Sequence, residues 1–253
     1  MHSLFDVEGR VIIVTGASSG LGEGFARGLH EAGALVVAVG RRRDRLDALV
    51  GGLGERSIAV VGDLTSASDR ELVLATALER WSKVDVLVNN AGTVLEHHPD
   101  GRDESLEEFL SVLDVNLVAL FAMTQLVARH MTERGEGGSI VNIGSMFGLV
   151  ASGGGASYVA SKGAVHALTK ELAVQWAQTG IRVNAIAPGW FPTALTSHVF
   201  DSDQGQSMLR RTVPMGRGGE ADELLGALLF LCSDASSYCT GQVLTIDGGY
   251  TAK

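Results

Sequence analysis

The chain has 253 residues, a length that fits one large α/β domain without a second folding unit. Hydrophobic residues make up 45% of the chain and charged residues 19%, which excludes a disordered protein. The formal net charge of −9 argues against nucleic acid and anionic membrane surfaces as partners. Wholly apolar runs are far shorter than the roughly 20 residues of a membrane-spanning helix. The first residues do not resemble a secretory signal, and the two cysteines, Cys232 and Cys239, fit a reducing cytoplasm.

Short strands and longer helices are predicted to alternate along most of the chain. Apolar, β-branched runs predict strands at Val11–Thr15, Leu35–Val39, Ile58–Val61, Val84–Asn89, Ser139–Ile143, Arg182–Ile186 and Val243–Ile246. Helical patterns lie between them at Gly20–Ala32, Asp44–Val50, Ser66–Trp81, Ser105–Glu133, Ser157–Gln178 and Ala221–Cys232. The strands are apolar at nearly every position, which indicates a parallel sheet covered on both faces. This order predicts a doubly wound α/β fold with a seven-stranded parallel sheet flanked by helices.

One segment, at about residues 190–215, breaks the alternation. It contains no clear strand, and Pro192 and Pro214 interrupt it. It follows the sixth strand, at the edge where such sheets bind ligands, so it is either a lid over a site or an ordinary surface insertion. We expect a single domain over residues 1–253, with this segment as the substrate lid.

The first predicted strand runs directly into the glycine-rich turn TGASSGLG. A pyrophosphate can approach backbone N–H groups closely only where residues lack a side chain, and the following helix start favours negative charge. The spacing differs from GxGxxG, and tight turns also use glycine, but the position between strand and helix favours a dinucleotide site. The predicted contacts are Gly16, Ser18, Ser19, Gly20 and Leu21.

The second predicted strand ends in Val39-Gly40 and is followed by three arginines. A carboxylate at this tip would bind the ribose hydroxyls of NAD, whereas an arginine accommodates the 2′-phosphate of NADP. Here no carboxylate is present, and Gly40 is expected to leave room for a phosphate beside Arg41 and Arg42. The pattern favours NADP, although part of the arginine run also fits a solvated helix face.

Two further strand ends are candidates for cofactor contacts. Asp63 and Leu64 follow the third strand, where the carboxylate could bind the adenine edge or cap the next helix. The fourth strand ends in Asn89-Asn90-Ala91-Gly92, small residues that suit packing against a flat cofactor but also suit a turn. We therefore expect cofactor contacts from Asn90, Ala91 and Gly92.

Tyr158 and Lys162 lie four residues apart within a helical pattern, which places them on one helix face. A free tyrosine has a pKa of about 10. A nearby lysine and the positive ring of an oxidised nicotinamide would lower that pKa and make the phenol a usable acid and base. Ser145 ends the preceding strand at the same sheet edge, where its hydroxyl can hold a substrate oxygen. A Tyr-x-x-x-Lys pair occurs readily by chance and is weak evidence for an active site. Its combination with Ser145 and a phosphate-binding turn is much stronger evidence.

With these motifs, the chain resembles the short-chain dehydrogenases/reductases of the compact, single-domain Rossmann type. The resemblance runs from Gly9 to Gly249 and includes TGASSGLG, NNAG and YVASK in the family's order. It implies a catalytic role for Asn116 in DVNL, whose backbone carbonyl would hold a water linked to Lys162, and nicotinamide contacts from Pro188, Gly189 and Thr193. It also implies that Tyr158 exchanges the proton while hydride passes to or from the nicotinamide ring, and that Tyr158 and Lys162 contact the cofactor. Many relatives have two serines where this chain has Gly144-Ser145.

A substrate pocket is expected around Ser145 and Tyr158, lined by Met146, Trp190 and Phe191, although any of these three could be core filling. Leu195, Val199 and Phe200 would then close over the substrate. The pair His97 and His98 lacks a third ligand at a recognisable spacing, so no metal is expected. His166 is expected to serve packing or an interface.

We therefore expect a cytoplasmic NAD(P)-dependent oxidoreductase that prefers NADP(H), with NAD(H) also compatible. Its reaction would be the reversible reduction of a ketone to a secondary alcohol. The alternatives are an NAD-dependent sugar or polyol dehydrogenase, a 3-oxoacyl carrier-protein reductase, and a catalytically silent dinucleotide sensor. Enoyl reductases of related fold use a wider Tyr–Lys spacing. The resemblance also implies a homotetramer or homodimer built on long helices with excess apolar surface.

Overall fold

Seven parallel strands form one sheet, in the order β3-β2-β1-β4-β5-β6-β7. The computed structural model describes residues 4–95 and 100–253. The strands are β1 (Val11–Thr15), β2 (Leu35–Gly40), β3 (Ser57–Val61), β4 (Val86–Asn89), β5 (Gly138–Ile143), β6 (Ile181–Pro188) and β7 (Val243–Ile246). The strand order reverses between β1 and β4, which creates the crevice at the carboxyl edge where such sheets bind ligands. The predicted doubly wound, seven-stranded fold is confirmed.

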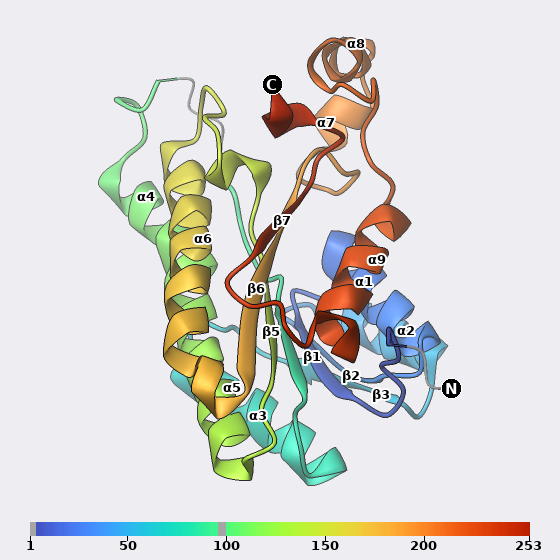
Figure 1. Ribbon diagram of the computed structural model, residues 1–253. Helices are drawn as coiled ribbons and strands as arrows, with labels where there is room; N and C mark the ends of the chain where they lie inside the picture. Colours follow the sequence, from blue (N-terminus) through green and yellow to red (C-terminus); the bar gives the residue numbers. More distant parts are fainter. Residues whose placement is uncertain (1–3, 96–99) are drawn as a thin grey trace.

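Helices cover both faces of the sheet (Figure 1). One layer contains α1 (Gly20–Glu31), α2 (Arg43–Leu53) and α9 (Ala221–Cys232). The other contains α3 (Ala67–Trp81), α4 (Leu106–Leu113), α5 (Leu120–Arg134) and α6 (Ala156–Trp176). Short 3-10 turns lie between these elements or after the last strand, at Met146–Gly148, Ala177–Thr179, Asp234–Ser236 and Tyr250–Ala252.

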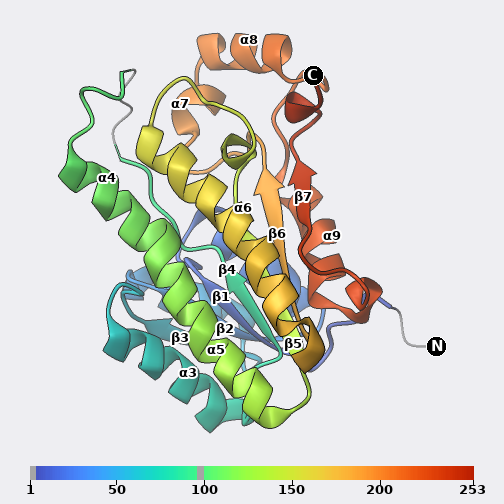
Figure 2. The same ribbon diagram turned by 60° about the vertical axis from the view of Figure 1, so that its left-hand side comes forward.

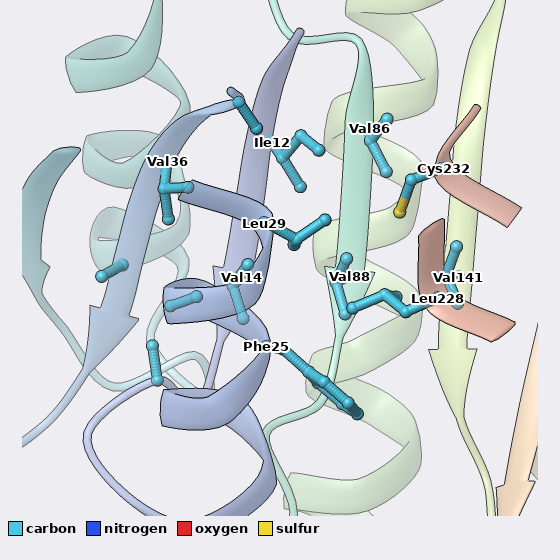
Figure 3. Packing of buried hydrophobic residues seen from close by; sticks show 14 of the residues in the cluster. Ile12, Val14, Phe25, Leu29, Val36, Val86, Val88, Val141, Leu228 and Cys232 are labelled. Atoms are coloured by element: carbon cyan, nitrogen blue, oxygen red, sulfur yellow. The ribbon is translucent and has the colours of Figure 1, made fainter. Parts of the chain in front are cut away.

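The two layers bury separate apolar clusters on the two sheet faces. In the first cluster, Phe25 and Leu29 of α1 and Leu228 of α9 lie on the strands (Figure 3). All three side chains are at most 2% exposed, and each contributes about 1.5–3 kcal/mol by leaving water. Burial on both faces explains why the strands are apolar at nearly every position rather than at alternate ones.

The segment at residues 190–215 contains two helices and, as expected, no strand. It holds α7 (Ser197–Phe200) and α8 (Asp203–Thr212), which lie beyond the carboxyl end of the sheet, beside the C-terminus (Figure 1, Figure 2). Val199, Leu209 and Val213 form a small apolar cluster of their own here, so the segment packs as a separate unit on the edge of the sheet.

The long helix predicted at Ser105–Glu133 is interrupted by a π-helical turn over Asp114–Ala119. The whole run Leu106–Arg134 is long and apolar enough, by length and composition alone, to cross a membrane, although charged residues interrupt it, so it is not a wholly apolar run. The core helix of a water-soluble domain passes the same test, and here Met123, Val127 and Met131 are buried in the second apolar cluster.

Candidate active site

The glycine-rich turn between β1 and α1 is folded against the end of β4. Gly16 and Gly20 have left-handed backbone angles, with φ of +69° and +58°. A Cβ on Gly16 would lie 2.8 Å from the Asn90 amide nitrogen, and one on Gly22 would lie 2.3 Å from the Gly16 carbonyl oxygen. The Ser19 side chain does not cap α1. Gly16 and Gly22 therefore let the turn close on itself and against β4. The helix start that it forms suits a pyrophosphate, because the Ser19 side chain leaves its N–H groups without a cap.

Of the arginines after β2, Arg42 is the one that contacts this turn. Its guanidinium donates to the Ser18 hydroxyl at 3.1 Å and to the Ser19 hydroxyl at 2.5 Å. The space expected at Gly40 is not open for a phosphate, because a Cβ there would lie 3.1 Å from Ser18. Gly40 instead allows the turn to approach β2. A cationic group thus lies beside two hydroxyls, an arrangement suited to a phosphate.

Arg41 points elsewhere, with a side chain 74% exposed and 3.7 Å from the Asp63 carboxylate. Asp63 accepts hydrogen bonds from the Thr65 backbone and hydroxyl, which together with Arg41 lower its pKa. Ser66, not Asp63, caps α3. The Asp63 carboxylate therefore already has Thr65 and Arg41 as partners, although it lies at the sheet edge where the adenine contact is predicted.

The three residues predicted to do the chemistry converge at the carboxyl end of β5. Ser145 lies two residues beyond Ile143, the last residue of this strand, and hydrogen-bonds the Tyr158 phenol. The Lys162 ammonium is 5.7 Å from the centre of the Tyr158 ring, so both residues share one face of α6. Lys162 is 5% exposed and donates to the Ile143 carbonyl at 2.9 Å. This arrangement places a proton donor and a hydroxyl side by side, with a buried cation beneath them.

The pKa of Tyr158 does not follow the expected direction in the protein alone. Burial raises it, and only the hydrogen bond from Ser145 opposes this effect. Burial also lowers the pKa of Lys162 to about 8, which weakens the lysine as a source of positive charge. The expected lowering is attributed to Lys162 together with the positive ring of an oxidised nicotinamide, and in the protein alone burial outweighs it.

Asn116 joins this group through the π-helical turn that carries it. Its side-chain oxygen accepts from the Thr93 N–H at 2.7 Å, and its amide donates to the Thr93 carbonyl at 2.9 Å and to the Ser161 hydroxyl at 3.0 Å. A Cβ on Gly92 would lie 3.3 Å from the Asn116 oxygen and 3.5 Å from the Lys162 ammonium. Insertions of this kind in helices often occur at functional sites, and this one links α6 to the end of β4.

The predicted nicotinamide loop follows β6. Pro188 ends that strand, and a Cβ on Gly189 would lie 2.6 Å from the backbone of Asp247, so Gly189 serves the approach of the β7 end. Thr193 packs opposite Gly20, with 3.5 Å between Thr193 and a Cβ built there. The loop is thus in contact with the glycine-rich turn.

Aromatic rings form one wall beside Ser145. The Phe147 ring packs edge-on against Trp190 at 5.7 Å and against Tyr250 at 6.1 Å between ring centres. The predicted pocket residues Met146 and Phe191 are instead 1% and 4% exposed and lie in the interior. Of the three predicted pocket residues, Trp190 alone keeps partial exposure, and Phe147 and Tyr250 are partly exposed as well.

The C-terminal turn holds this wall against the segment at residues 190–215. The Asp247 carboxylate accepts from the N–H groups of Gly249 and Thr251, both at 2.8 Å. The Met215 N–H donates to the Gly248 carbonyl at 3.1 Å, and Lys253 donates to the Thr212 carbonyl at 2.5 Å. The last residues of the chain therefore fasten the base of α8.

Comparison with known proteins identifies the family. A family model described as enoyl-(acyl carrier protein) reductase matches residues 16–251. The chain is 38% identical to gluconate 5-dehydrogenase of Gluconobacter oxydans over 251 residues, which cover 98% of this chain and 97% of that protein. The chain belongs to the short-chain dehydrogenase/reductase family.

Further relatives agree with this assignment. The chain is 37% identical to 2-dehydro-3-deoxy-D-gluconate 5-dehydrogenase of Dickeya dadantii, with 98% of each chain covered. The crystal structure of gluconate 5-dehydrogenase from Burkholderia cenocepacia, in complex with NADP and tartrate, matches with a TM-score of 0.93. That match has 36% identity and covers 99% of this chain and 98% of the other. The protein is therefore an oxidoreductase of the short-chain family.

Sequence reasoning missed several residues that build the site of this short-chain dehydrogenase/reductase. The Thr15 hydroxyl accepts from the N–H groups of Asn90 and Ala91 at 2.9 and 3.0 Å, which joins the ends of β1 and β4. Glu104 accepts hydrogen bonds from the backbone and hydroxyl of Ser157, and so caps α6 just before Tyr158. The glycine cap of α6 has no side chain of its own to do this. In the sequence, the one sign of this contact is Gly155 at the start of α6, because a glycine cannot cap the helix with its own side chain.

Some predicted contacts serve the fold of this family member. Leu21 packs against the first apolar cluster and Ala91 against the second, while Leu64 is 9% exposed. Ser18 is 8% exposed. His97 and His98 lie outside the described residues, and residues 4–95 and 100–253 contain no group of three side chains that could hold a metal ion.

Proposed function

We propose that the protein catalyses reversible hydride transfer between NADP(H) and a ketone or secondary alcohol, with Tyr158 as acid and base. One observation carries this proposal: the Tyr158 phenol, the Ser145 hydroxyl and the Lys162 ammonium meet at the carboxyl end of β5. The end of β4 connects these groups to the glycine-rich turn. Gly92 lies next to the Lys162 ammonium, and Asn90, two residues earlier, donates to the Gly16 carbonyl. A protein that only binds dinucleotides has no use for the phenol.

In reduction, Ser145 and Tyr158 hold the carbonyl oxygen between two hydroxyl donors. NADPH supplies the hydride when bound. As negative charge develops on the oxygen, Tyr158 gives up its proton and the alcohol forms. Ser145 stabilises the phenolate that remains by donating a hydrogen bond to it. Lys162, with a pKa of about 8, stabilises that phenolate electrostatically and can return a proton to the site. In oxidation the same groups act in reverse.

Arg42, Ser18 and Ser19 support the choice of NADP(H). We expect Arg42→Ala to raise the KM for NADPH by about 10- to 100-fold, the loss of a charged hydrogen bond of about 1.5–3 kcal/mol. The KM for NADH should change little, since NADH lacks the 2′-phosphate. Steady-state rates with both cofactors measure this.

Arg41→Ala is the matched control for that variant, because Arg41 is the exposed neighbour that pairs with Asp63. Its KM for NADPH should rise less than that of Arg42→Ala. Equal effects of the two substitutions, or an equal loss with NADPH and NADH, would contradict the assignment of the phosphate to Arg42.

The relatives favour a polyhydroxylated substrate, since two of them are dehydrogenases of gluconate and of a gluconate derivative. The four-residue spacing of Tyr158 and Lys162 argues against the enoyl reduction named in the family model's description. A panel of polyols, sugar acids, simple ketones and a 3-oxoacyl thioester, assayed with each cofactor, tests the reaction and the class together. Turnover of no alcohol or ketone in the panel would refute the proposal.

We further propose that residues 190–215 act as a lid within a single catalytic domain. The segment carries its own apolar cluster of Val199, Leu209 and Val213, with Trp190 packed against it, so it can move as a unit beside the substrate wall. Lids of this kind exclude water and complete the site when substrate binds.

The protein is proposed to act as a homotetramer or homodimer in the cytoplasm, where its free cysteines, Cys232 and Cys239, stay reduced. Leu106 and Leu110 on α4 are 71% and 54% exposed, and Val118 in the π-helical turn is 53% exposed. A cluster of exposed apolar residues marks an interaction surface.

We expect sedimentation analysis to show two or four chains, and Leu110→Lys to shift the protein toward the monomer. Leu72→Lys on α3, at a leucine that is 50% exposed, serves as the control and should leave the assembly unchanged. A monomeric wild-type protein would contradict this proposal.

A further inference from the structure

His166 is a buried residue for which the proposed reaction has no use. It lies one helical turn after Lys162 on α6 and is 4% exposed. Neither ring nitrogen has a partner of good hydrogen-bonding geometry among the described residues. Burial lowers its pKa to about 4, against a weak opposing contact with the Gly148 backbone, and Lys162 and Lys170 lower it further. The ring is therefore neutral at ordinary pH.

The imidazole fills the space of two missing side chains. A Cβ on Gly144 would lie 2.1 Å from the Nε2 atom of His166, and one on Gly148 would lie 2.6 Å from its Cε1 atom. Neither glycine has a positive φ, so the backbone would accept other residues at both positions. At Gly144 all the nearest atoms belong to the His166 ring, which therefore requires glycine there, whereas at Gly148 the Lys162 backbone at 2.7 Å excludes a Cβ as well.

Gly144 and Gly148 flank the turn that carries Ser145. On one side, Lys162 donates to the Ile143 carbonyl just before Gly144. Within the turn, the Phe147 N–H donates to the Ser145 hydroxyl at 3.1 Å. His166 thus packs behind a turn whose position sets the contact of Ser145 with Tyr158.

We propose that His166 is a positioning residue that, with Gly144 and Gly148 as its complementary surface, fixes the Ser145 turn against the helix of Tyr158 and Lys162. This inference rests on the proposed function for its catalytic consequence. The contact itself does not depend on that function. The departure Gly144-Ser145 from the usual pair of serines then has a cause, because a serine side chain at 144 would collide with the ring.

The experiment is a double-mutant cycle of His166→Ala and Gly144→Ala with two readouts. The first readout is stability to urea. Gly144→Ala alone should destabilise the protein, and Gly144→Ala in the His166→Ala background should destabilise it far less, because the ring that the new methyl meets is gone. Gly163→Ala is the control on the same helix, since a Cβ there would lie 3.7 Å from its nearest neighbour.

The second readout is the pH profile of kcat/KM for alcohol oxidation, which a residue that only fills space would not move. With the turn loosened, Ser145 should lose its hold on the phenolate. We expect His166→Ala to lower kcat about tenfold, to leave the KM for NADP nearly unchanged, and to shift the ascending limb of the profile upward by about one pH unit. The double variant should recover part of that shift.

The outcomes separate the two proposals. Additive effects on stability would overturn the contact, and coupled stability with an unmoved pH profile would overturn the positioning role. Failure of the proposed function would appear differently, as wild-type turnover by Tyr158→Phe, and would leave the coupling in stability intact.

Discussion

Replacing Tyr158 with phenylalanine should lower kcat about a thousandfold, with NADP binding reduced no more than a few fold. The substitution removes one hydroxyl and keeps the ring, so the fold and the glycine-rich turn stay as they are. The loss follows because, among the residues that the structure describes, no other acid is hydrogen-bonded to Ser145, and positioned acids of this kind contribute about 10²–10⁴-fold. Turnover followed by NADPH absorbance, and binding followed by NADPH fluorescence, measure the two quantities separately.

Tyr250→Phe is the matched control, since Tyr250 belongs to the same aromatic wall but is not hydrogen-bonded to Ser145. It should retain most of the activity. A Tyr158→Phe variant within tenfold of wild-type kcat would remove Tyr158 from the proposed reaction and favour a dinucleotide sensor over an enzyme.

Replacing Lys162 with methionine should lower kcat at neutral pH about a hundredfold or more, the range for loss of one preorganised electrostatic contact. Burial already raises the pKa of Tyr158, so removal of the nearby ammonium leaves still less to stabilise the phenolate. Alcohol oxidation needs the phenolate, and its rate rises with pH through the phenol pKa. The ascending limb should therefore move to higher pH in the variant, as pH profiles of kcat/KM would show.

Lys170→Met on the same helix serves as the control, because Lys170 is exposed. Its profile should match the wild type. An unchanged profile for Lys162→Met would mean that the lysine serves only the Ile143 carbonyl, which accepts its hydrogen bond at 2.9 Å.

The sheet could be predicted from the sequence because its strands are buried on both faces and therefore carry an uninterrupted apolar signal. Val11–Thr15 is an example whose predicted bounds match the structure. The convergence of Ser145 and Tyr158 was also predictable, since parallel strands bring their carboxyl ends to one edge. The helix α8 could not be predicted in this way because DQGQSMLRRT is mostly polar and buries only Gly205 and Leu209.

Other features depend on direction and burial, which residue types alone do not encode. Arg41 and Arg42 are neighbours of the same residue type, yet of the two it is Arg42 that contacts the glycine-rich turn. The direction of the Tyr158 pKa depends on how deeply the phenol is enclosed. The π-helical turn at Asn116 leaves the composition of its helix unchanged, so only the backbone reveals it.

The turn after β7 connects the last residues of the chain to the site. Lys253 and Gly248 are hydrogen-bonded to Thr212 and Met215, at and just after the end of α8. The Tyr250 ring packs against the Phe147 ring, two residues after Ser145. Near the N-terminus, the Leu4 carbonyl instead accepts from the N–H of Ala235, which follows α9, at 2.8 Å. A displacement of the residues after β7 is therefore transmitted both to the base of α8 and to the aromatic ring beside Ser145.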